Sequence, residues 1–234
     1  MAASAEASRS VLFWVIWRLT TDADVGVVVQ AAEVLRLCLD TESMDGQADR
    51  DAFLGAFYDH YIQWLVEPFW QGDEGGGEGG EAAPAARATA AAKACLAHLC
   101  DLLSYCVRSH TYRMKYFVLR NHIVARVLRL ARCRDKFLQL AAVRFLRACV
   151  GIKDDFYNRY IVKNNLLAPV FALLAQNAAK DNLITSAIME LLEFLRSENV
   201  KSLIEYIVER FESEFGQLGH APVLKVSAVT DVHT

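Results

Sequence analysis

The tripeptide Tyr116-Phe117-Val118 returns 44 residues later as Tyr160-Ile161-Val162, and 46 residues after that as Tyr206-Ile207-Val208. The sequence around the first two copies matches at the same two spacings. The pairs at 44 residues include Tyr112 and Phe156, Lys115 and Arg159, Asn121 and Asn165, and Leu130 and Leu174, and those at 46 residues include Asp135 and Asp181, Ala141 and Ala187, and Leu146 and Leu192. A period in the low to middle forties with helical patterning is typical of armadillo and HEAT repeats. The sequence therefore predicts an all-α fold, an armadillo/HEAT-like α-solenoid of stacked helical repeats.

The repeat pattern divides the chain into three parts. We expect residues 1–24 to be an N-terminal extension with one apolar helix, residues 25–215 to form the repeat domain, and residues 216–234 to be a loose tail. Inside the repeat domain, residues 72–87 are dominated by Gly, Ala and Glu and predict a flexible loop. The expected helices are 10–19, 25–39, 49–66, 88–108, 111–119, 122–133, 136–150, 154–163, 166–177, 182–196 and 200–215.

Composition indicates a folded, reduced, intracellular chain. Of its 234 residues, 54% are hydrophobic and 23% are charged, which fits a soluble domain. None of the six cysteines lies in a CxxC pair, and most occupy apolar helix positions. The apolar run at residues 11–17 is shorter than the roughly 20 residues that cross a bilayer, so it predicts a buried first helix, with a targeting segment as the alternative.

The charge of the chain is unevenly placed. Residues 108–163 carry 14 basic and 3 acidic side chains, whereas residues 1–107 carry 6 basic and 16 acidic ones, and residues 164–234 carry 5 and 9. Such a basic centre attracts phosphate, nucleic acid or an acidic protein segment. The alternative is an ordinary solvated face of arginine-rich helices.

No arrangement of residues predicts catalysis, a metal site or a cofactor. Cys95 and His98, and Cys106 and His110, have helical spacing for a shared metal, but no second pair completes a zinc site. We therefore expect no catalytic residues, no metal, no cofactor, no small-molecule substrate and no membrane contact.

Two equivalent helices carry a polar stripe on an otherwise apolar surface. The stripe contains Lys136, Gln139, Arg144 and Arg147 in the first helix, and Asn182, Thr185 or Ser186, Glu190 and Glu193 in the second. At the 46-residue offset, Arg144 faces Glu190 and Arg147 faces Glu193 if the helices pack side by side and parallel. The stripe predicts an ion-pair ladder between repeats, and also a groove for a partner.

The connection from Gly151 to Arg159 is more polar than the repeat demands. Its aromatic side chains are expected to turn inward, and Asp154 or Asp155 to cap a short helix. The polar residues that remain predict a partner-binding surface. Its candidates are Lys153, Asp154, Asp155, Asn158, Arg159, Asn164 and Asn165.

The segment Gly151-Ile152-Lys153-Asp154-Asp155-Phe156-Tyr157-Asn158-Arg159-Tyr160-Ile161 closely resembles a signature of the Smek/falafel family, regulatory subunit 3 of protein phosphatase 4. Further segments follow in the family's order. They are Leu39 to Met44, Phe53 to Tyr58, His110 to Tyr112, Asn182 to Ile188 with Glu190-Leu191, and Lys201 to Leu203. The resemblance spans about residues 25–215, the family's central helical region. The front pleckstrin-like domain and the long charged tail of the family have no counterpart here, so substrate choice through that domain is not carried over.

The resemblance implies a non-catalytic scaffold subunit. It would bind the phosphatase 4 catalytic subunit and a companion regulatory subunit and help to target phosphoprotein substrates. It also implies residence in nucleus and cytoplasm and a link to dephosphorylation after DNA damage. The alternative function is a helical-repeat module that binds nucleic acid or acidic phosphoprotein through residues 108–163, of which nucleic acid is the less favoured ligand.

Overall fold

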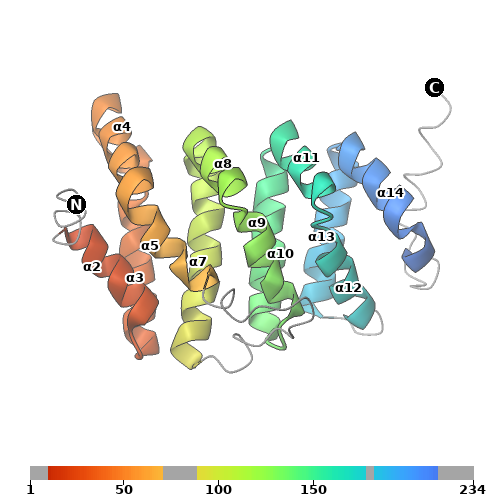
Figure 1. Ribbon diagram of the computed structural model, residues 1–234, viewed down its shortest axis with the longest axis horizontal. Coiled ribbons are helices and arrows are strands. Elements are labelled where there is room, and N and C mark those ends of the chain that lie inside the picture. Colours follow the sequence, from red (N-terminus) through yellow and green to blue (C-terminus); the bar gives the residue numbers. More distant parts are fainter. Residues whose placement is uncertain (1–9, 71–88, 178–181, 216–234) are drawn as a thin grey trace.

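The computed structural model describes residues 10–70, 89–177 and 182–215, and all regular structure in these ranges is helical (Figure 1). The expected loop 72–87, the expected tail 216–234, residues 1–9 of the extension and Asp181 lie outside the described residues. Within the described ranges, the expectation of an all-α helical-repeat fold is confirmed.

The helices form two layers that run along one axis. The first layer, here called the inner layer, contains α3 (Val25–Cys38), α7 (Ala90–Ser109), α10 (Lys136–Gly151) and α13 (Leu183–Ser197), each packed against the next (Figure 1). The outer layer contains α4 (Gln47–Ala56), α5 (Ile62–Val66), α8 (Thr111–Arg120), α9 (Ile123–Val127), α11 (Asp155–Lys163), α12 (Ala168–Asn177) and α14 (Lys201–Phe215). At the N-terminal end, α2 (Val11–Thr21) packs on α3 and α5.

Short irregular turns replace parts of two expected helices. The expected helix 49–66 is divided by a π-helical turn, η2 (Phe57–Tyr61), and is followed by η3 (Glu67–Phe69). The expected helix 122–133 ends as α9 at Val127 and continues as a tighter 3-10 turn, η4 (Leu128–Arg132). A further 3-10 turn, η1 (Thr41–Ser43), connects the inner-layer helix α3 to α4.

Burial sets the register of the repeat. In the inner layer, the buried residues Leu138, Ala142, Phe145 and Leu146 of α10 return 46 residues later as Ile184, Ile188, Leu191 and Leu192 of α13, as expected. In the outer layer, the buried residues Met114, Val118, Ile123 and Val127 return after 43 residues as Tyr157, Ile161, Leu166 and Val170. The 44-residue alignment of the two tyrosine tripeptides is therefore wrong by one residue, because the buried faces and not the identical letters align the helices.

Aspartate or asparagine side chains cap the start of four α-helices among the described residues. Asp24 accepts from the Gly26 amide at 2.7 Å, Asp135 from Phe137 at 3.0 Å, Asp154 from Phe156 at 2.9 Å and Asn182 from Ile184 at 2.9 Å. Each cap satisfies an amide that has no partner inside its helix, which contributes about 1 kcal/mol. Two of these caps open the neighbouring helices α10 and α13 and so fix where their polar stripes lie.

The helix α7 is the centre of the core. It packs on α3 along one side and on α10 along the other. It is long and apolar enough to pass as a membrane span, but Leu99, Cys100 and Leu103 are fully buried between its neighbours. That burial is the pattern of a core helix in a stack.

Candidate functional site

A groove of about 900 Å³ lies along the exposed face of the inner layer. Its charged lining consists of the arginines Arg36, Arg108, Arg144 and Arg147 and the carboxylates Glu33, Asp101 and Glu190. These side chains come from all four inner-layer helices, α3, α7, α10 and α13. We call this surface the arginine groove.

The arginine groove contains the ladder residues, but in a different pairing. The helices α10 and α13 pack side by side, as expected. Arg147 donates from Nε to Oε1 of Glu190 at 2.9 Å, while Glu193 accepts from Nε of Arg196 in its own helix at 2.9 Å. Among the described residues, the expected pairs Arg144 with Glu190 and Arg147 with Glu193 do not form. The arginine reaches diagonally, one turn back along α13.

Arg147 is held on two further sides. Its guanidinium lies over the ring of Phe194, 3.5 Å from the centroid. Phe194 and Glu190 are four residues apart on α13, so the ring and the carboxylate face the same side of that helix. A Cβ on Gly151 would lie only 2.9 Å from Nη1 of Arg147, so the glycine leaves the space that this guanidinium occupies.

A second arginine is fixed in the same way at the other side of the groove. Arg36 of α3 lies over the ring of Tyr105 of α7, 3.1 Å from the centroid. The Tyr105 hydroxyl donates to Oδ1 of Asp40 at 3.0 Å, which holds the ring in place. Arg108 follows Tyr105 by three residues on α7, so it lies one helical turn from the ring on which Arg36 stacks.

Asp101 of α7 lines the same groove as the four arginines. Burial raises the pKa of its carboxyl, and the charges of His98, Arg144 and Arg108 oppose that rise. Arg144 and Arg108 line the groove with this carboxylate and come from two different helices, α10 and α7.

The predicted partner-binding residues lie elsewhere, at the start and end of α11. Lys153 has a left-handed backbone with a φ of 56°, and Asn199 has a φ of 49° at the equivalent place 46 residues later. The Lys153 ammonium pairs with Glu198 of the next unit. Lys153 therefore has a structural role, because its ion pair with Glu198 connects two neighbouring repeats.

Asp154 has two structural contacts. Oδ1 caps α11, and Oδ2 accepts from Nζ of Lys115 on α8 at 2.8 Å. Burial acts to raise the pKa of Asp154, but the Lys115 ammonium and the Phe156 amide outweigh it and lower that pKa. Asp155 and Arg159 are both exposed.

The two asparagines after α11 end the helix. Asn164 donates from Nδ2 to the Tyr160 carbonyl at 2.8 Å, and Asn165 has a left-handed φ of 51°. Oδ1 of Asn165 accepts from the hydroxyl of Tyr206 on α14. Asn164 thus caps its own helix, and Asn165 connects two outer-layer helices.

Two expectations for this segment are wrong. Asn158 is only 4% exposed, and Phe156 is 61% exposed although its ring was expected to turn inward. The buried face of α11 carries Tyr157, Asn158 and Ile161, which leaves Phe156 on the opposite side.

An exposed aromatic cluster completes this surface, and the sequence reasoning missed it. Tyr112 and Tyr116 of α8 are 65% and 57% exposed, with ring centroids 4.7 Å apart. Nζ of Lys115 lies 4.8 Å from the ring centroid of Phe156 and so connects the two helices. We call Tyr112, Tyr116 and Phe156 the aromatic ridge. An alignment at 43 residues would have predicted this cluster, because Tyr116 is then equivalent to the exposed Arg159 and not to the half-buried Tyr160.

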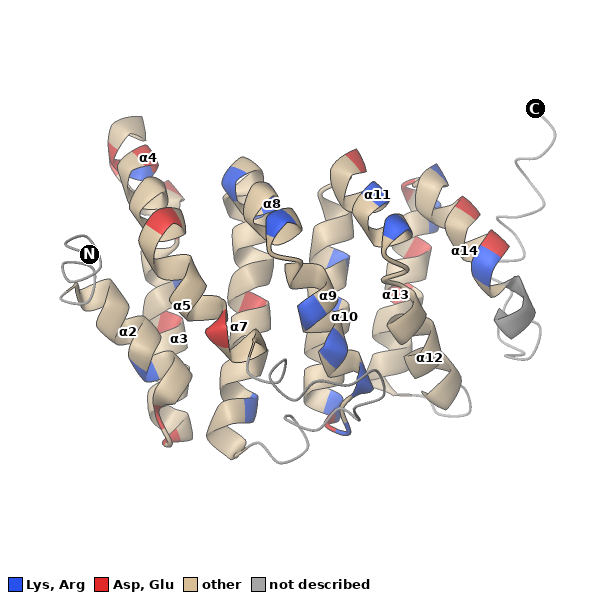
Figure 2. Ribbon diagram, viewed as in Figure 1, with Lys and Arg blue, Asp and Glu red and all other residues tan. Residues whose placement is uncertain are grey.

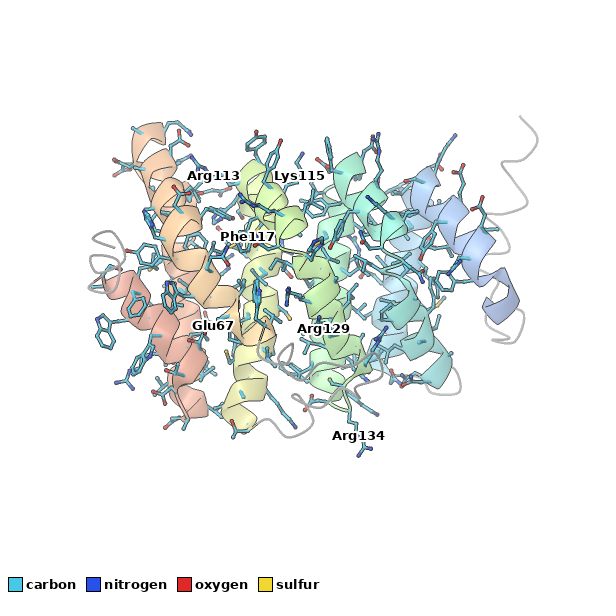
Figure 3. All side chains as sticks on the ribbon, in the orientation of Figure 1. Glu67, Arg113, Lys115, Phe117, Arg129 and Arg134 are labelled. Atoms are coloured by element: carbon cyan, nitrogen blue, oxygen red, sulfur yellow. The ribbon has the colours of Figure 1, made fainter. Side chains whose placement is uncertain are left out.

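The basic segment 108–163 does not form one surface. Arg108, Arg144 and Arg147 line the arginine groove. Other basic residues spread over the outer layer, with Arg113 and Lys115 near the start of α8 and Arg129 and Arg134 toward the opposite end (Figures 2 and 3). A continuous track for a nucleic-acid backbone would need these charges on one face.

The described residues hold no group of three side chains placed to bind a metal ion. His110 is buried, and its ring nitrogens contact the Tyr58 hydroxyl at 3.0 Å and the Leu39 carbonyl at 2.9 Å. Burial raises the pKa of Cys95 and of Cys106 to about 12, so both thiols stay protonated. Cys95, Cys106 and His110 are therefore parts of the core, whereas His98 lines the arginine groove.

A sequence model of the family described as Phosphatase 4 regulatory subunit 3 matches residues 2–228. The chain is 34% identical over 225 residues to Serine/threonine-protein phosphatase 4 regulatory subunit 3 of Drosophila melanogaster, covering 94% of this chain and 22% of that protein. It is 31% identical over 217 residues to Suppressor of Mek1 of Dictyostelium discoideum, covering 88% and 20%. It is 32% identical over 203 residues to Protein PPP4R3C1 of Mus musculus, covering 86% and 25%.

The chain thus spans about a fifth to a quarter of the length of these relatives. No solved structure matches it. The expectation of a regulatory and not a catalytic protein is confirmed by the name of the family. Because the family model covers nearly the whole chain and relatives above 30% identity agree with it, the chain belongs to the phosphatase 4 regulatory subunit 3 family.

Proposed function

We propose that the chain is a non-catalytic scaffold of a protein phosphatase 4 complex. In this function it binds the catalytic subunit and a companion regulatory subunit and helps to target phosphoprotein substrates. The observation that carries the proposal is the family match over residues 2–228. A stack of helical repeats suits this work, because it presents long surfaces on which several proteins bind at once.

We place the contact with a phosphatase subunit on the aromatic ridge and the exposed end of α11. Three large rings stand exposed there beside the basic side chain of Arg159. Aromatic residues and arginine are enriched at the centres of protein interfaces, where they contribute most of the binding energy. Asp155 and Asn164 flank the same surface, whereas Asn158 is excluded by its burial.

The test uses Phe156→Ala combined with Arg159→Glu. Both residues are exposed and neither caps a helix, so the fold should survive, as far-ultraviolet circular dichroism would check. The immobilised chain is mixed with purified phosphatase 4 catalytic subunit and its companion subunit, and the bound fraction is measured. Loss of one exposed ring and one interface charge predicts at least about a ten-fold weaker complex.

Phe137→Ala combined with Lys136→Glu is the matched control. These residues are also exposed, at the start of α10, and the variant makes the same changes in size and charge. An equal loss of binding in both variants, or none in either, would contradict the placement of the interface. Failure of the unaltered chain to bind either subunit would contradict the proposed function itself.

In the cell, we propose that the protein acts in the nucleus and the cytoplasm, including in dephosphorylation after DNA damage. This part of the proposal rests on the family alone.

A further inference from the structure

The arginine groove has room for a peptide. Its volume of about 900 Å³ is near the upper end of the range of about 300–1,000 Å³ for ligand sites. Four inner-layer helices line it, and packed helices lie about 8–10 Å apart, so the groove crosses roughly 25–30 Å. An extended chain covers this span in about eight or nine residues.

The arginines of the groove are prepared for an anion. Arg36 and Arg147 are each fixed on an aromatic ring, and stacking leaves the edge of a guanidinium free to donate. Among the described residues, no carboxylate lies within ion-pair distance of Arg36, Arg108 or Arg144. Three of the four arginines that line the groove thus form no direct ion pair in the part of the chain that the structure describes, although the charges of Arg108 and Arg144 act on Asp101.

The charge and geometry of a phosphate monoester match these arginines. A phosphoserine carries a charge of about −1.5 to −2 at pH 7 and three acceptor oxygens. Arginine binds such a group through two parallel hydrogen bonds, which are about twice as strong as neutral ones. Arg108 and Arg144 line the same groove from the neighbouring helices α7 and α10, so both are available to a phosphate bound there.

The carboxylates of the groove decide between a phosphorylated peptide and a nucleic acid. Glu33 and Asp101 lie in the same lining as the arginines and repel a backbone that carries a phosphate at every unit. A peptide with one phosphate can place it at the arginines and neutral or basic residues at the carboxylates. The mixed lining therefore favours a single phosphate on an otherwise uncharged or basic segment.

We propose that the arginine groove binds an extended protein segment that carries a phosphoserine or phosphothreonine, through Arg36, Arg108, Arg144 and Arg147. The proposal deepens the proposed function and rests on it, because it assigns the recruitment of phosphorylated proteins to one surface of the scaffold. The groove opens on the inner layer, whereas the aromatic ridge lies on the outer layer, so the two surfaces can be occupied together.

The experiment measures peptide binding by fluorescence anisotropy with the 234-residue chain. The probes are pools of labelled nine-residue peptides with a central phosphoserine or phosphothreonine and mixed flanking residues, their unphosphorylated counterparts, and a nine-nucleotide single-stranded DNA. We expect the phosphorylated pools to bind about ten-fold more tightly than both other probes. Equal binding of phosphorylated and unphosphorylated pools, or tighter binding of the DNA, would overturn the proposal.

Arg108→Ala combined with Arg144→Ala should remove most of this preference, a loss of about ten-fold or more. Arg108→Lys combined with Arg144→Lys should give an intermediate loss, because the charge remains but the paired hydrogen bonds do not. The matched control is Arg120→Ala combined with Lys163→Ala, which removes two exposed basic side chains of the outer layer. Its phosphopeptide affinity should stay within about two-fold, and an equal loss there would overturn the assignment to the groove.

The same variants are assayed for capture of the phosphatase 4 catalytic subunit. Retained capture with lost phosphopeptide binding supports both proposals. A chain that captures the subunit but does not distinguish phosphorylated peptides contradicts the groove assignment alone. A chain that distinguishes the peptides but captures no subunit contradicts the proposed function alone.

Discussion

At the scale of the residue, Gly151 shows how one missing side chain shapes the arginine groove. The residue ends α10, where alanine would ordinarily stabilise a helix by about 0.5–1 kcal/mol. An added Cβ would lie 2.9 Å from Nη1 of Arg147, so the guanidinium would have to shift from its place on Phe194 and Glu190. We infer that glycine is required here for the position of Arg147 and not for the backbone of the helix.

This inference predicts a coupling between two substitutions. Gly151→Ala should stabilise the chain by about 0.5–1 kcal/mol when Arg147 is replaced by alanine, and by less or not at all when Arg147 is present. Urea unfolding of the unaltered chain, both single variants and the double variant measures the four free energies of unfolding. Equal effects of Gly151→Ala in the two backgrounds would show that the glycine and the arginine are independent.

At the scale of the element, Asp154 connects the start of α11 to α8. One carboxylate oxygen caps the helix and the other accepts from Lys115. Asp154→Ala removes both contacts and should cost about 1 kcal/mol or slightly more. Asp154→Asn keeps a capping oxygen and should cost only a few tenths of a kcal/mol, as thermal or urea unfolding would check. Similar losses for both variants would contradict the division of work between the two oxygens.

The pKa of Asp154 gives the same contact a dependence on pH. Its folded value lies below the value of about 3.9 in an unfolded chain, so the ionised form stabilises the fold. That stability is complete above the unfolded pKa and is lost as pH falls through the lower folded pKa. Asp154→Asn should therefore reduce the difference in stability between pH 7 and pH 3.

The elements show what the sequence could and could not predict. The caps Asp24 and Asp135 can be predicted because each precedes an apolar run. The 46-residue register of α10 and α13 can be predicted because their buried residues recur at the same helical spacing. The predicted alignment of α8 with α11 is wrong by one residue, because it follows two similar tripeptides and not the positions that are buried. The exposure of Phe156 and the burial of Asn158 both follow from which face of α11 turns toward the core. The identity of one residue alone does not predict that face.

The pairing across the arginine groove shows a second limit. The repeat spacing predicts Glu193 of α13 as the partner of Arg147. In the structure Arg147 instead pairs with Glu190, one helical turn earlier on α13. The pairing of Arg147 with Glu190 depends on the length of the arginine side chain and on its stacking over the ring of Phe194. It also depends on Glu193, which pairs with Arg196 of its own helix and not with Arg147. None of these terms is periodic, so no repeat spacing predicts them.

At the scale of the whole molecule, the chain is a stack in which each helix depends on its neighbours. The helix α7 contacts α3 on one side and α10 on the other, whereas α14 packs on α11, α12 and α13 from one side at the end of the described stack. In such a structure, the free energy of unfolding is the sum of the intrinsic stability of each repeat and the energies of the interfaces between neighbouring repeats. Local unfolding of a helix at one end of the stack therefore breaks fewer interfaces than local unfolding of a central helix.

Native-state hydrogen exchange should reveal this gradient. Amides of α2 and α14 are expected to exchange through low-energy local openings, and those of α7 and α10 only through openings close to global unfolding. Leu103→Ala in α7 should cost about 2–5 kcal/mol and lower the protection of all inner-layer helices, because Leu103 is fully buried at the centre. Ile207→Ala removes a similarly buried side chain from α14 and should lower protection only there and in its neighbours α11, α12 and α13. Mass spectrometry of exchanged peptides distinguishes the two patterns, and equal protection of α14 and α7 would mean that the stack unfolds as one cooperative unit.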